Sequence, residues 1–484
     1  MEESSQTRPF RAIIVGGGLL GLTAAHIFAK TDMDYVVLEQ HDDLMPDIGS
    51  LLSLMPPTFR MLDQLDLLDA VAPVVTGCGR NVFMSASDGS VWKQETLGQL
   101  VETNHGHGIR IVHRPDYVKA LYNSLPESAQ ARIHVRKRVV RVDVADDGVA
   151  VHCADGTVEY GSIVIGADGV HSRTRQVMQS LAAGSPADAE QPNPYVTTYR
   201  MLFGNLAPPP GLFLNTNYEG AGNGVSTQIL IGRTQAWLAV YEKLEAPTSK
   251  RLRWTEDDKR AVVKKWGHLY VAPGYTLDDA YQRCSGAIGL INLEEGLVDK
   301  WAWKRIVLVG DAVRKLEPHA GLGYNSGAMD LVEVVNGLRR LTQKTASPAT
   351  QDLEDVFRAY QARRLEDTPA IVAMSERRAR MCAWLTTKDW FMARFVVPWV
   401  PLGPYSVNHI FGPIISRTPV LEWLDEKHLP ARHIPYVHHP RQETKEHLIY
   451  STTPHEPKSK LPLFTATLVL ATLATVGFRF YRRM

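Results

Sequence analysis

A glycine-rich turn near the N-terminus, GGGLLG, constrains the fold of this chain more than any other feature. It follows the apolar run Arg11–Val15 directly and leads into an apolar-periodic segment, 22–29, so strand, turn and helix are expected in that order. The next apolar run, 35–38, is expected to be the second strand of a βαβ unit. These segments predict an α/β fold that begins with a parallel strand pair.

Three glycines of the turn have the GxGxxG spacing of dinucleotide-binding folds. Gly16 permits the tight turn, Gly18 lets the backbone approach a pyrophosphate, and Gly21 lets helix and strand pack closely. Glu39 ends the second predicted strand, where its carboxylate can accept hydrogen bonds from an adenosine ribose. The motif therefore predicts a bound dinucleotide, and these residues alone leave FAD and NAD(P) open.

Two further segments place glycine and aspartate directly after an apolar strand. The run 162–165 continues into GADGVHSR, which contains Asp168, and the run 305–309 continues into GDAVRKLEPHAGLGYNSG, which contains Asp311. Ligands of open α/β sheets bind at the carboxyl ends of the strands. We therefore expect the three segments to meet at one ligand.

Composition excludes other classes of protein. Fifty-three Lys and Arg against 52 Asp and Glu leave a formal net charge of +1, so no basic field is available for nucleic acid. The 4 cysteines lie too far apart for a zinc site or a dense disulfide framework. His433, His438 and His439 match no ligand spacing, so we predict no metal site and interpret 427–460 as an extended linker.

An uncharged apolar segment, 461–478, lies between basic residues near the C-terminus. As a helix with a rise of about 1.5 Å per residue it would span about 27 Å, close to the hydrocarbon thickness of the endoplasmic reticulum membrane. Since no secretory leader precedes the first strand, this predicts a single-pass membrane protein, with a C-terminal transmembrane helix, a cytosolic body and a location in the endoplasmic reticulum. A buried terminal helix is the alternative. The proline-interrupted apolar segment 390–415 is expected either at the membrane interface or as a packing element.

The fingerprint, GADGVHSRTR at 166–175 and GDAVRKLEPHAGLGYNSGAMD at 310–330 together resemble the single-component FAD-dependent monooxygenases of the para-hydroxybenzoate hydroxylase type, over about residues 8–380. EPHAGLGYNSG and the apolar tail are most similar to the membrane-anchored fungal monooxygenases that epoxidise prenyl chains of meroterpenoids and indole diterpenes. The resemblance implies bound FAD, NADPH as a transient reductant and O2 as the oxidant.

The resemblance also assigns cofactor contacts. Asp168 matches a motif linked to FAD and NAD(P)H, and Asp311 matches an aspartate that hydrogen-bonds the ribitol or ribose of FAD. Gly321 and Gly323 match a turn whose backbone amides lie beside the isoalloxazine, and Arg114 matches an arginine at a helix start. Taken singly, Asp168 and Asp311 are equally typical of turn or helix caps, and Arg114 of a surface charge.

Two positions depart from the family pattern. Arg314 replaces a histidine, and Leu322 replaces a glutamine, which predicts a more apolar flavin neighbourhood. The histidines His113 and His319 and the hydroxyl of Tyr324 could serve as an acid or base, but the sequence does not place them, so no catalytic residue is assigned.

The predicted architecture is a Rossmann-like FAD-binding domain with a mainly β substrate domain and a C-terminal helical region. The expected ranges are 8–190 and 283–345 for the FAD-binding domain, 191–282 for the substrate domain, 346–426 for the helical region, 427–460 for the linker and 461–478 for the transmembrane helix. Within them, Val225–Ile231 and 236–241 are expected to be strands, and Glu256–Trp266 and 351–382 to be helices.

The expected reaction uses NAD(P)H and O2 to insert one oxygen atom into a hydrophobic small molecule. Epoxidation of a prenyl alkene is the first expectation, and hydroxylation of a phenolic ring is the nearest alternative. A polyprenyl reductase and a non-enzymatic prenyl-binding escort protein are the remaining alternatives.

Overall fold

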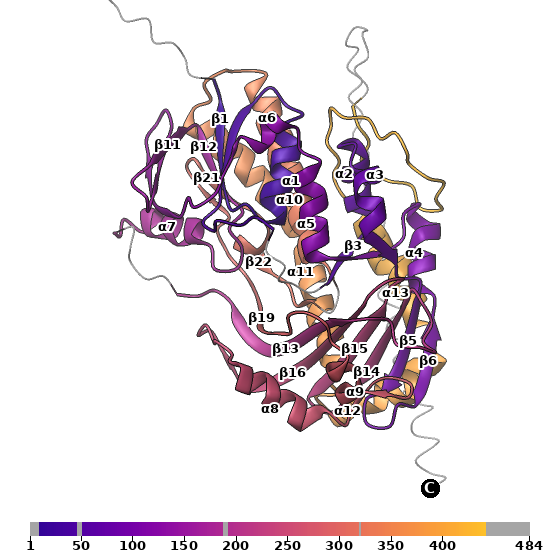
Figure 1. Cartoon of the computed structure of the whole chain (residues 1–484). Helices are drawn as coiled ribbons and strands as arrows, with labels where there is room; N and C mark the ends of the chain where they lie inside the picture. The colour runs from indigo at the N-terminus through magenta and orange to yellow at the C-terminus, as the bar shows by residue number, and fades with distance from the viewer. Residues whose placement is uncertain (1–8, 46–50, 187–191, 319–320, 442–484) are drawn as a thin grey trace, which may run out of the picture. The chain divides into compact units, whose positions relative to one another are not determined.

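A mixed α/β body is organised around two large sheets (Figure 1). The structure is a computed structural model, and it describes residues 9–45, 51–186, 192–318 and 321–441. One sheet has six strands and the other has eight. The α/β fold predicted from the N-terminal motif is confirmed.

The six-stranded sheet has the order β20-β21-β12-β1-β2-β8. Its strands are β1 (Arg11–Val15), β2 (Asp34–Leu38), β8 (Ile133–His134), β12 (Ile163–Gly166), β20 (Ala302–Trp303) and β21 (Ile306–Leu308). Strand β1 pairs in parallel with both β2 and β12, so that Ala12 lies opposite Tyr35 and Ile163. With helix α1 (Leu19–Phe28), β1 and β2 form the predicted βαβ unit. Strands β1, β12 and β21 are adjacent and parallel, so the three motifs that follow them lie at one edge of the sheet.

The eight-stranded sheet is antiparallel except for the parallel pair β14–β5, in the order β22-β19-β13-β16-β15-β14-β5-β6. Its strands are β5 (Arg80–Ser85), β6 (Val91–Glu95), β13 (Val196–Leu206), β14 (Thr216–Ala221), β15 (Val225–Ile231), β16 (Ala236–Thr248), β19 (Gly289–Leu297) and β22 (Arg314–Lys315). Strands from 80–95 and 289–315 thus join those of 191–282. Its two faces differ: one covers an apolar core under α8 (Glu256–Trp266) and α9 (Leu277–Gln282), and residues of the other line a cavity.

Smaller sheets and helices complete the described chain. The smaller sheets are β11-β10-β9 (Val158–Gly161, Val149–Cys153, Val139–Val144), β3-β7-β4 (Leu51–Leu54, Arg110–His113, Val75–Gly77) and β17-β18 (Tyr270–Ala272, Tyr275–Thr276). The other helices are α2 (Pro56–Gln64), α3 (Leu68–Val71), α4 (Leu97–His105), α5 (Arg114–Asn123), α6 (Glu127–Gln130), α7 (Arg173–Ala182), α10 (Gly323–Thr342), α11 (Thr350–Cys382), α12 (Thr387–Phe391), α13 (Leu402–Ser406) and α14 (Gly412–Ser416). Helix α10 packs against α1, α2 and α11.

Several elements agree closely with the sequence patterns. Strand β15 and helix α8 have the predicted bounds, and α11 begins one residue earlier than expected. Helix α8 begins where it does because Thr255 and Asp258 form a capping box, in which each side chain accepts a hydrogen bond from the backbone of the other. Strand β16 continues beyond the predicted 236–241, to Thr248, because it pairs with β13 over most of its length.

The structure corrects the prediction of a transmembrane helix. Within the described ranges, no helix is both long enough and apolar enough to cross a membrane. Helix α11 is long but carries many charged residues, and the apolar segment 390–415 forms short helical elements that are interrupted at Val400 and Pro401. The segment 461–478 itself lies outside the described residues. The predicted single-pass membrane location in the endoplasmic reticulum, and the membrane as a partner, are contradicted by this finding.

The described part of the expected linker, 427–441, is irregular but is bound to the folded body. The backbone N–H of Ile434 donates to the carbonyl of Asn104 at 2.8 Å, and the hydroxyl of Tyr436 donates to the carbonyl of His105 at 2.9 Å. Lys427 also pairs with Asp66. A segment without helix or strand periodicity can thus still be packed, because its backbone finds hydrogen-bond partners on α4.

Candidate active site

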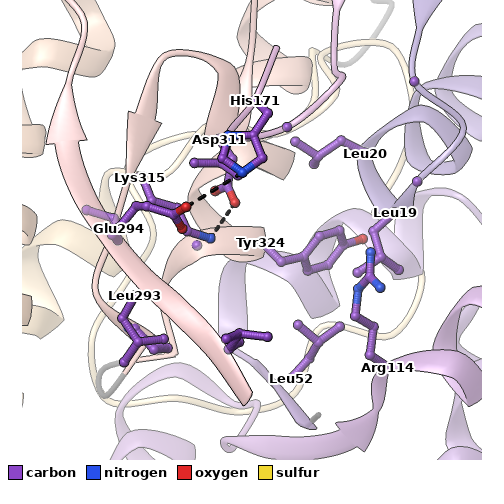
Figure 2. Close-up of a pocket in the computed structure, with 18 of the residues that line it drawn as sticks. Leu19, Leu20, Leu52, Arg114, His171, Leu293, Glu294, Asp311, Lys315 and Tyr324 are labelled. Carbon is purple, nitrogen blue, oxygen red and sulfur yellow. Dashed lines mark hydrogen bonds and ion pairs between the residues drawn. The ribbon is translucent and has the colours of Figure 1, made fainter. Parts of the chain in front are cut away.

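A cavity of about 1610 Å³ is lined by all three motifs and by one face of the eight-stranded sheet. Figure 2 shows the side of the cavity that is formed by the motifs. The predicted site residues that line it are Gly16, Gly18, Glu39, Arg114, Asp168, Asp311, Gly321 and Gly323. Gly21 does not line the cavity but lies within α1. Residues from distant parts of the sequence therefore meet at one site, as the position of the motifs after their strands suggested.

The glycine turn leaves open space where a phosphate could approach. A Cβ atom added to Gly18 would have no heavy atom within 4 Å, so this backbone faces the cavity. By contrast, a Cβ atom at Gly21 would lie 1.9 Å from the carbonyl oxygen of Gly16. Gly16 has a φ of 107°, in the region that favours glycine. The three glycines thus form a turn that is open at Gly18. At Gly16 and Gly21 the fold itself requires glycine.

Glu39 holds the turn from the end of β2. Its side chain is buried, and its Oε2 accepts a hydrogen bond from the backbone N–H of Gly17 at 2.6 Å. Its Oε1 accepts one from the backbone N–H of His41 at 2.9 Å. The carboxylate therefore sits at the mouth of the glycine turn, the position from which a ribose contact was predicted.

Asp168 is bound to the start of α7. Its carboxylate accepts hydrogen bonds from the hydroxyl of Ser172 at 2.5 Å and from the backbone N–H of Thr174 at 2.9 Å. Burial raises the pKa of Asp168, and these hydrogen bonds oppose that effect. The capping role that the sequence left open is therefore present, and Asp168 also lines the cavity.

Asp311 belongs to a cluster of charged side chains that sequence reasoning missed (Figure 2). Lys315 donates a hydrogen bond to Oδ2 of Asp311 at 2.6 Å, and Nε2 of His171 lies 3.7 Å from Oε1 of Glu294. The Glu294 side chain is only 8% exposed, and burial raises its pKa. Burial also lowers the pKa of His171. No sequence pattern indicated this cluster, because its residues come from three segments that are far apart along the chain.

Arg114 extends into the cavity from the first position of α5, directly after β7. Among the described residues, nothing forms a hydrogen bond or ion pair with its guanidinium. Enclosure by the surrounding protein lowers the pKa of Arg114, and the carboxylate of Asp311 opposes this shift. An exposed positive group that lines the cavity and has no partner among the described residues is suited to an anionic ligand.

Of the three side chains considered as acids or bases, two form hydrogen bonds within the protein and the third is not described. The hydroxyl of Tyr324 lies 2.9 Å from Oγ1 of Thr23 and 3.0 Å from the hydroxyl of Tyr117, so it is engaged within the protein. Nε2 of His113 lies 3.1 Å from the side-chain amide of Asn205. His319 lies outside the described residues.

The residue that replaces the family histidine, Arg314, points into the core. Its Nη2 donates to both carboxylate oxygens of Asp330, at 2.8 Å and 2.7 Å, and Nε of Arg364 donates to the same carboxylate at 2.9 Å. The Arg314 and Asp330 side chains are 1% and 0% exposed. Arg314 therefore joins the GD motif to α10 and α11 rather than contacting a ligand. Leu322, which replaces the family glutamine, does line the cavity.

The residues present fit FAD. The open face at Gly18, the guanidinium of Arg114 and the start of α1 together offer a cradle for a pyrophosphate. The turn at Gly321 and Gly323 lies on the same cavity, with Gly321 at a φ of 64°. The cavity exceeds the roughly 300–1,000 Å³ of an ordinary small-molecule pocket, so it has room for a dinucleotide and a second molecule.

Comparison with known proteins gives the same cofactor. Residues 10–191 and 275–372 match the model of the FAD binding domain family. FAD-dependent monooxygenase srdH of Neurospora crassa is 34% identical over 423 residues, which cover 84% of this chain and 94% of that protein. FAD-dependent monooxygenase DEP2 of Alternaria brassicicola is 30% identical over 439 residues, which cover 88% of this chain and 81% of that protein.

Solved structures show the same fold. HpxO of Klebsiella pneumoniae, complexed with FAD and uric acid, superposes with a TM-score of 0.67 at 19% sequence identity, covering 86% of this chain and 98% of that one. The family match spans both segments that carry the motifs, and the fungal relatives match over most of their length. The chain therefore belongs to the FAD binding domain family and is an FAD-dependent monooxygenase.

Proposed function

We propose that the enzyme epoxidises an alkene of a hydrophobic, prenyl-bearing substrate, with NADPH as the electron donor. One atom of O2 forms the epoxide and the other leaves as water, while NADPH gives up a hydride and is oxidised to NADP+, and one proton is taken up from solvent. FAD supplies the oxygen-activating redox chemistry when it is bound. The remaining tasks belong to the chain: binding the cofactor, orienting the hydrocarbon and excluding water.

The observation that carries this proposal is the composition of the cavity. The motifs that fit FAD form one part of its lining, and the eight-stranded sheet contributes apolar side chains to another part. Those apolar side chains are Met201, Phe203, Leu230 and Leu293. Leu52 and Leu322 add apolar surface beside the cofactor motifs. A hydrocarbon chain can therefore lie against apolar side chains in the same cavity as the cofactor motifs, and this apolar lining excludes water from its part of the cavity.

The placement of the acid and base candidates favours epoxidation over phenol hydroxylation. Deprotonation of a phenol benefits from a base within hydrogen-bond reach of the substrate. The hydroxyl of Tyr324 is engaged with Thr23 and Tyr117, and His113 is engaged with Asn205. An isolated alkene has no proton to remove, so its oxidation does not require such a base.

We further propose a role in fungal meroterpenoid or terpenoid biosynthesis. Support comes from the fungal FAD-dependent monooxygenases that the chain resembles over most of its length, among them ausM of Aspergillus calidoustus, which is 29% identical over 416 residues.

The test is oxygen transfer from isotopically labelled O2. Holoenzyme is incubated with NADPH or NADH and a set of farnesyl-bearing compounds, and products are analysed by mass spectrometry and NMR. Epoxidation adds one labelled oxygen and removes one alkene, whereas hydroxylation adds one labelled oxygen and keeps every alkene. A gain of two hydrogens without oxygen would identify a reductase. Failure to incorporate label into any prenyl compound, with FAD bound and reduced normally, would overturn the proposal.

A further inference from the structure

Hydrogen bonds join four polar side chains on the cavity face of the eight-stranded sheet. The hydroxyl of Tyr241 on β16 donates to Oε1 of Gln228 on β15 at 2.8 Å. Nε2 of Gln228 donates to Oδ1 of Asn217 on β14 at 3.0 Å, and Nδ2 of Asn217 donates to Oε1 of Glu219 at 2.7 Å. All four side chains line the cavity. We call Asn217 and Gln228 the amide pair.

The carboxylate at the end of this chain determines how the amides are oriented. Glu219 can only accept, so Asn217 must present its NH2 group to it and its oxygen to Gln228. Gln228 must then present its NH2 group to Asn217 and its oxygen to Tyr241, which donates. Each amide nitrogen donates one of its two hydrogens within this series of hydrogen bonds, and the second hydrogen is left to donate elsewhere.

The second hydrogens of the amide pair have no acceptor on the described protein. Apart from the bonds above, neither amide nitrogen forms a hydrogen bond with a described residue. On the same strands, Tyr218 and Ile229 point into the core on the other face, so alternation directs the amide pair toward the cavity. Asn217 is only 5% exposed. A donor that is nearly buried calls for an acceptor from whatever fills the cavity.

Apolar side chains lie next to the amide pair on the same face of the sheet. Leu230 follows Gln228 on the same face of β15, and Ala239 lies opposite Gln228 in the register with β16. Met201 and Phe203 line the cavity from β13, next to β16. Another side-chain amide that lines the cavity is Asn81, which lies opposite Asn217 in the pairing of β5 with β14. Donors are therefore concentrated at one place on an apolar surface.

We propose that the substrate has two parts: a hydrocarbon part that lies against the apolar side chains, and a carbonyl oxygen that accepts hydrogen bonds from Asn217 and Gln228. This inference rests on the proposed oxidation of a hydrocarbon and adds how that hydrocarbon is oriented. The amide pair is neutral, so it suits a neutral carbonyl better than a carboxylate or phosphate. Anchoring one end of the substrate selects which alkene lies beside the cofactor.

The test compares two ligands that differ only at the carbonyl. Farnesylacetone supplies a ketone and a prenyl chain, and its analogue has a methylene in place of the ketone. Binding to the FAD-loaded enzyme is measured by perturbation of flavin absorbance, which needs no turnover. We expect the wild type to bind the ketone about 10-fold to 100-fold more tightly than the hydrocarbon, because hydrogen-bonding sites reject ligands that leave their polar groups unpaired.

Two variants and one control separate recognition from packing. Asn217→Leu and Gln228→Met keep the approximate shape but remove the donors, so each should abolish the preference for the ketone and leave hydrocarbon affinity nearly unchanged. Leu230→Val, on the same face of β15, should weaken both ligands to the same degree. The flavin spectrum and the melting temperature of each variant report whether the fold is kept.

The outcomes distinguish this inference from the proposed function. Equal affinity of the wild type for both ligands, or equal loss of both in Asn217→Leu, would overturn the inference. If either ligand were still oxygenated in that case, the proposed function would stand. Failure of the wild-type holoenzyme to bind either ligand would overturn the inference as well, and absence of oxygen transfer to every prenyl compound would overturn the proposed function.

Discussion

The ammonium nitrogen of Lys315 lies 2.6 Å from Oδ2 of Asp311, so the carboxylate expected to contact FAD already has a cationic partner. Both side chains line the cavity, and they lie on the GD motif four residues apart. Burial lowers the pKa of Lys315, but the carboxylates of Asp311 and Glu294 outweigh this, so its pKa is raised and it stays charged. The pair positions Asp311 and adds positive charge near an anionic cofactor.

Lys315→Met should weaken FAD binding by roughly 10-fold, since a hydrogen bond between charged groups contributes about 1.5–3 kcal/mol. The variant removes the cation and leaves Asp311 and Glu294 without compensation. Fluorescence titration of the apoprotein with FAD measures the change. Lys119→Met, on the exposed surface of α5, is the control and should bind FAD as the wild type does. Unchanged FAD affinity in Lys315→Met would show that the ammonium group of Lys315 does not contribute to FAD binding.

Gly18 and Gly21 should respond to valine in opposite ways. At Gly18 a Cβ atom meets nothing within 4 Å and the backbone φ is −70°, so Gly18→Val should fold but fill the space that a pyrophosphate needs. At Gly21 a Cβ atom would lie 1.9 Å from the Gly16 carbonyl oxygen, so Gly21→Val should disrupt the packing of α1 on β1. We expect a colourless protein with a near-normal apoprotein melting temperature for Gly18→Val, and an unstable protein for Gly21→Val. A yellow Gly18→Val protein would contradict the proposed phosphate site.

The cofactor motifs could be predicted from the sequence because each is a local pattern. The spacing of Gly16, Gly18 and Gly21 and the apolar runs before the glycines determine strand, turn and helix within a few residues. Their convergence could be predicted because the carboxyl ends of parallel strands lie at one edge of the sheet, where ligands bind. Arg114 and Asp311 both line the cavity, and their contact with FAD stays a prediction.

The charged cluster and the amide pair could not be predicted, because both depend on strand register. Glu294 lies near Lys315 because β19 pairs with β22 such that Gly296 is opposite Lys315. Asn217 and Gln228 come together through the antiparallel pairing of β14 with β15. The alternation of side chains along a strand shows which of its residues share a face. It does not show which other strand pairs with that strand, or in which register.

Glu294→Gln should stabilise the protein at neutral pH. Burial raises the pKa of Glu294, with Asp311 adding to the shift and Lys315 and Arg251 opposing it. Folding therefore favours the protonated carboxyl, and this contribution is full below the ordinary carboxyl pKa and is lost as the pH rises through the raised value. Glutamine stays neutral, so the variant should melt at a higher temperature than the wild type at pH 7, and the difference should vanish toward about pH 4.

Melting curves of the FAD-loaded proteins across this pH range measure the effect. His171, the nearest titratable neighbour, has a pKa lowered by burial, so it is neutral near pH 7 in both proteins. Glu127→Gln, at an exposed position of α6, is the control and should leave the pH profile unchanged. A lower melting temperature for Glu294→Gln at pH 7 would mean that Lys315 stabilises the ionised carboxylate more than burial destabilises it.

Asp330→Asn should destabilise the fold strongly without touching the cavity. The Asp330 carboxylate is fully buried and accepts hydrogen bonds from Arg314, Arg364 and the backbone N–H of Gly310. An asparagine would leave two buried guanidinium groups without a counter-charge, which costs roughly 3–5 kcal/mol. Urea denaturation gives the free energy of unfolding. The remaining folded protein should still bind FAD, because Asp330 is not among the residues that line the cavity.

The matched control for that prediction is an ion pair nearer the surface. Glu422 accepts a hydrogen bond from Arg340 at 2.6 Å, and these side chains are 24% and 31% exposed. Because water solvates both partners after the pair is broken, Glu422→Gln should cost only about 0–1 kcal/mol. Equal losses in the two variants would show that Arg314 and Arg364 find other partners when Asp330 is neutralised. In that case the arginine in place of the family histidine would not be what ties the GD motif to helices α10 and α11.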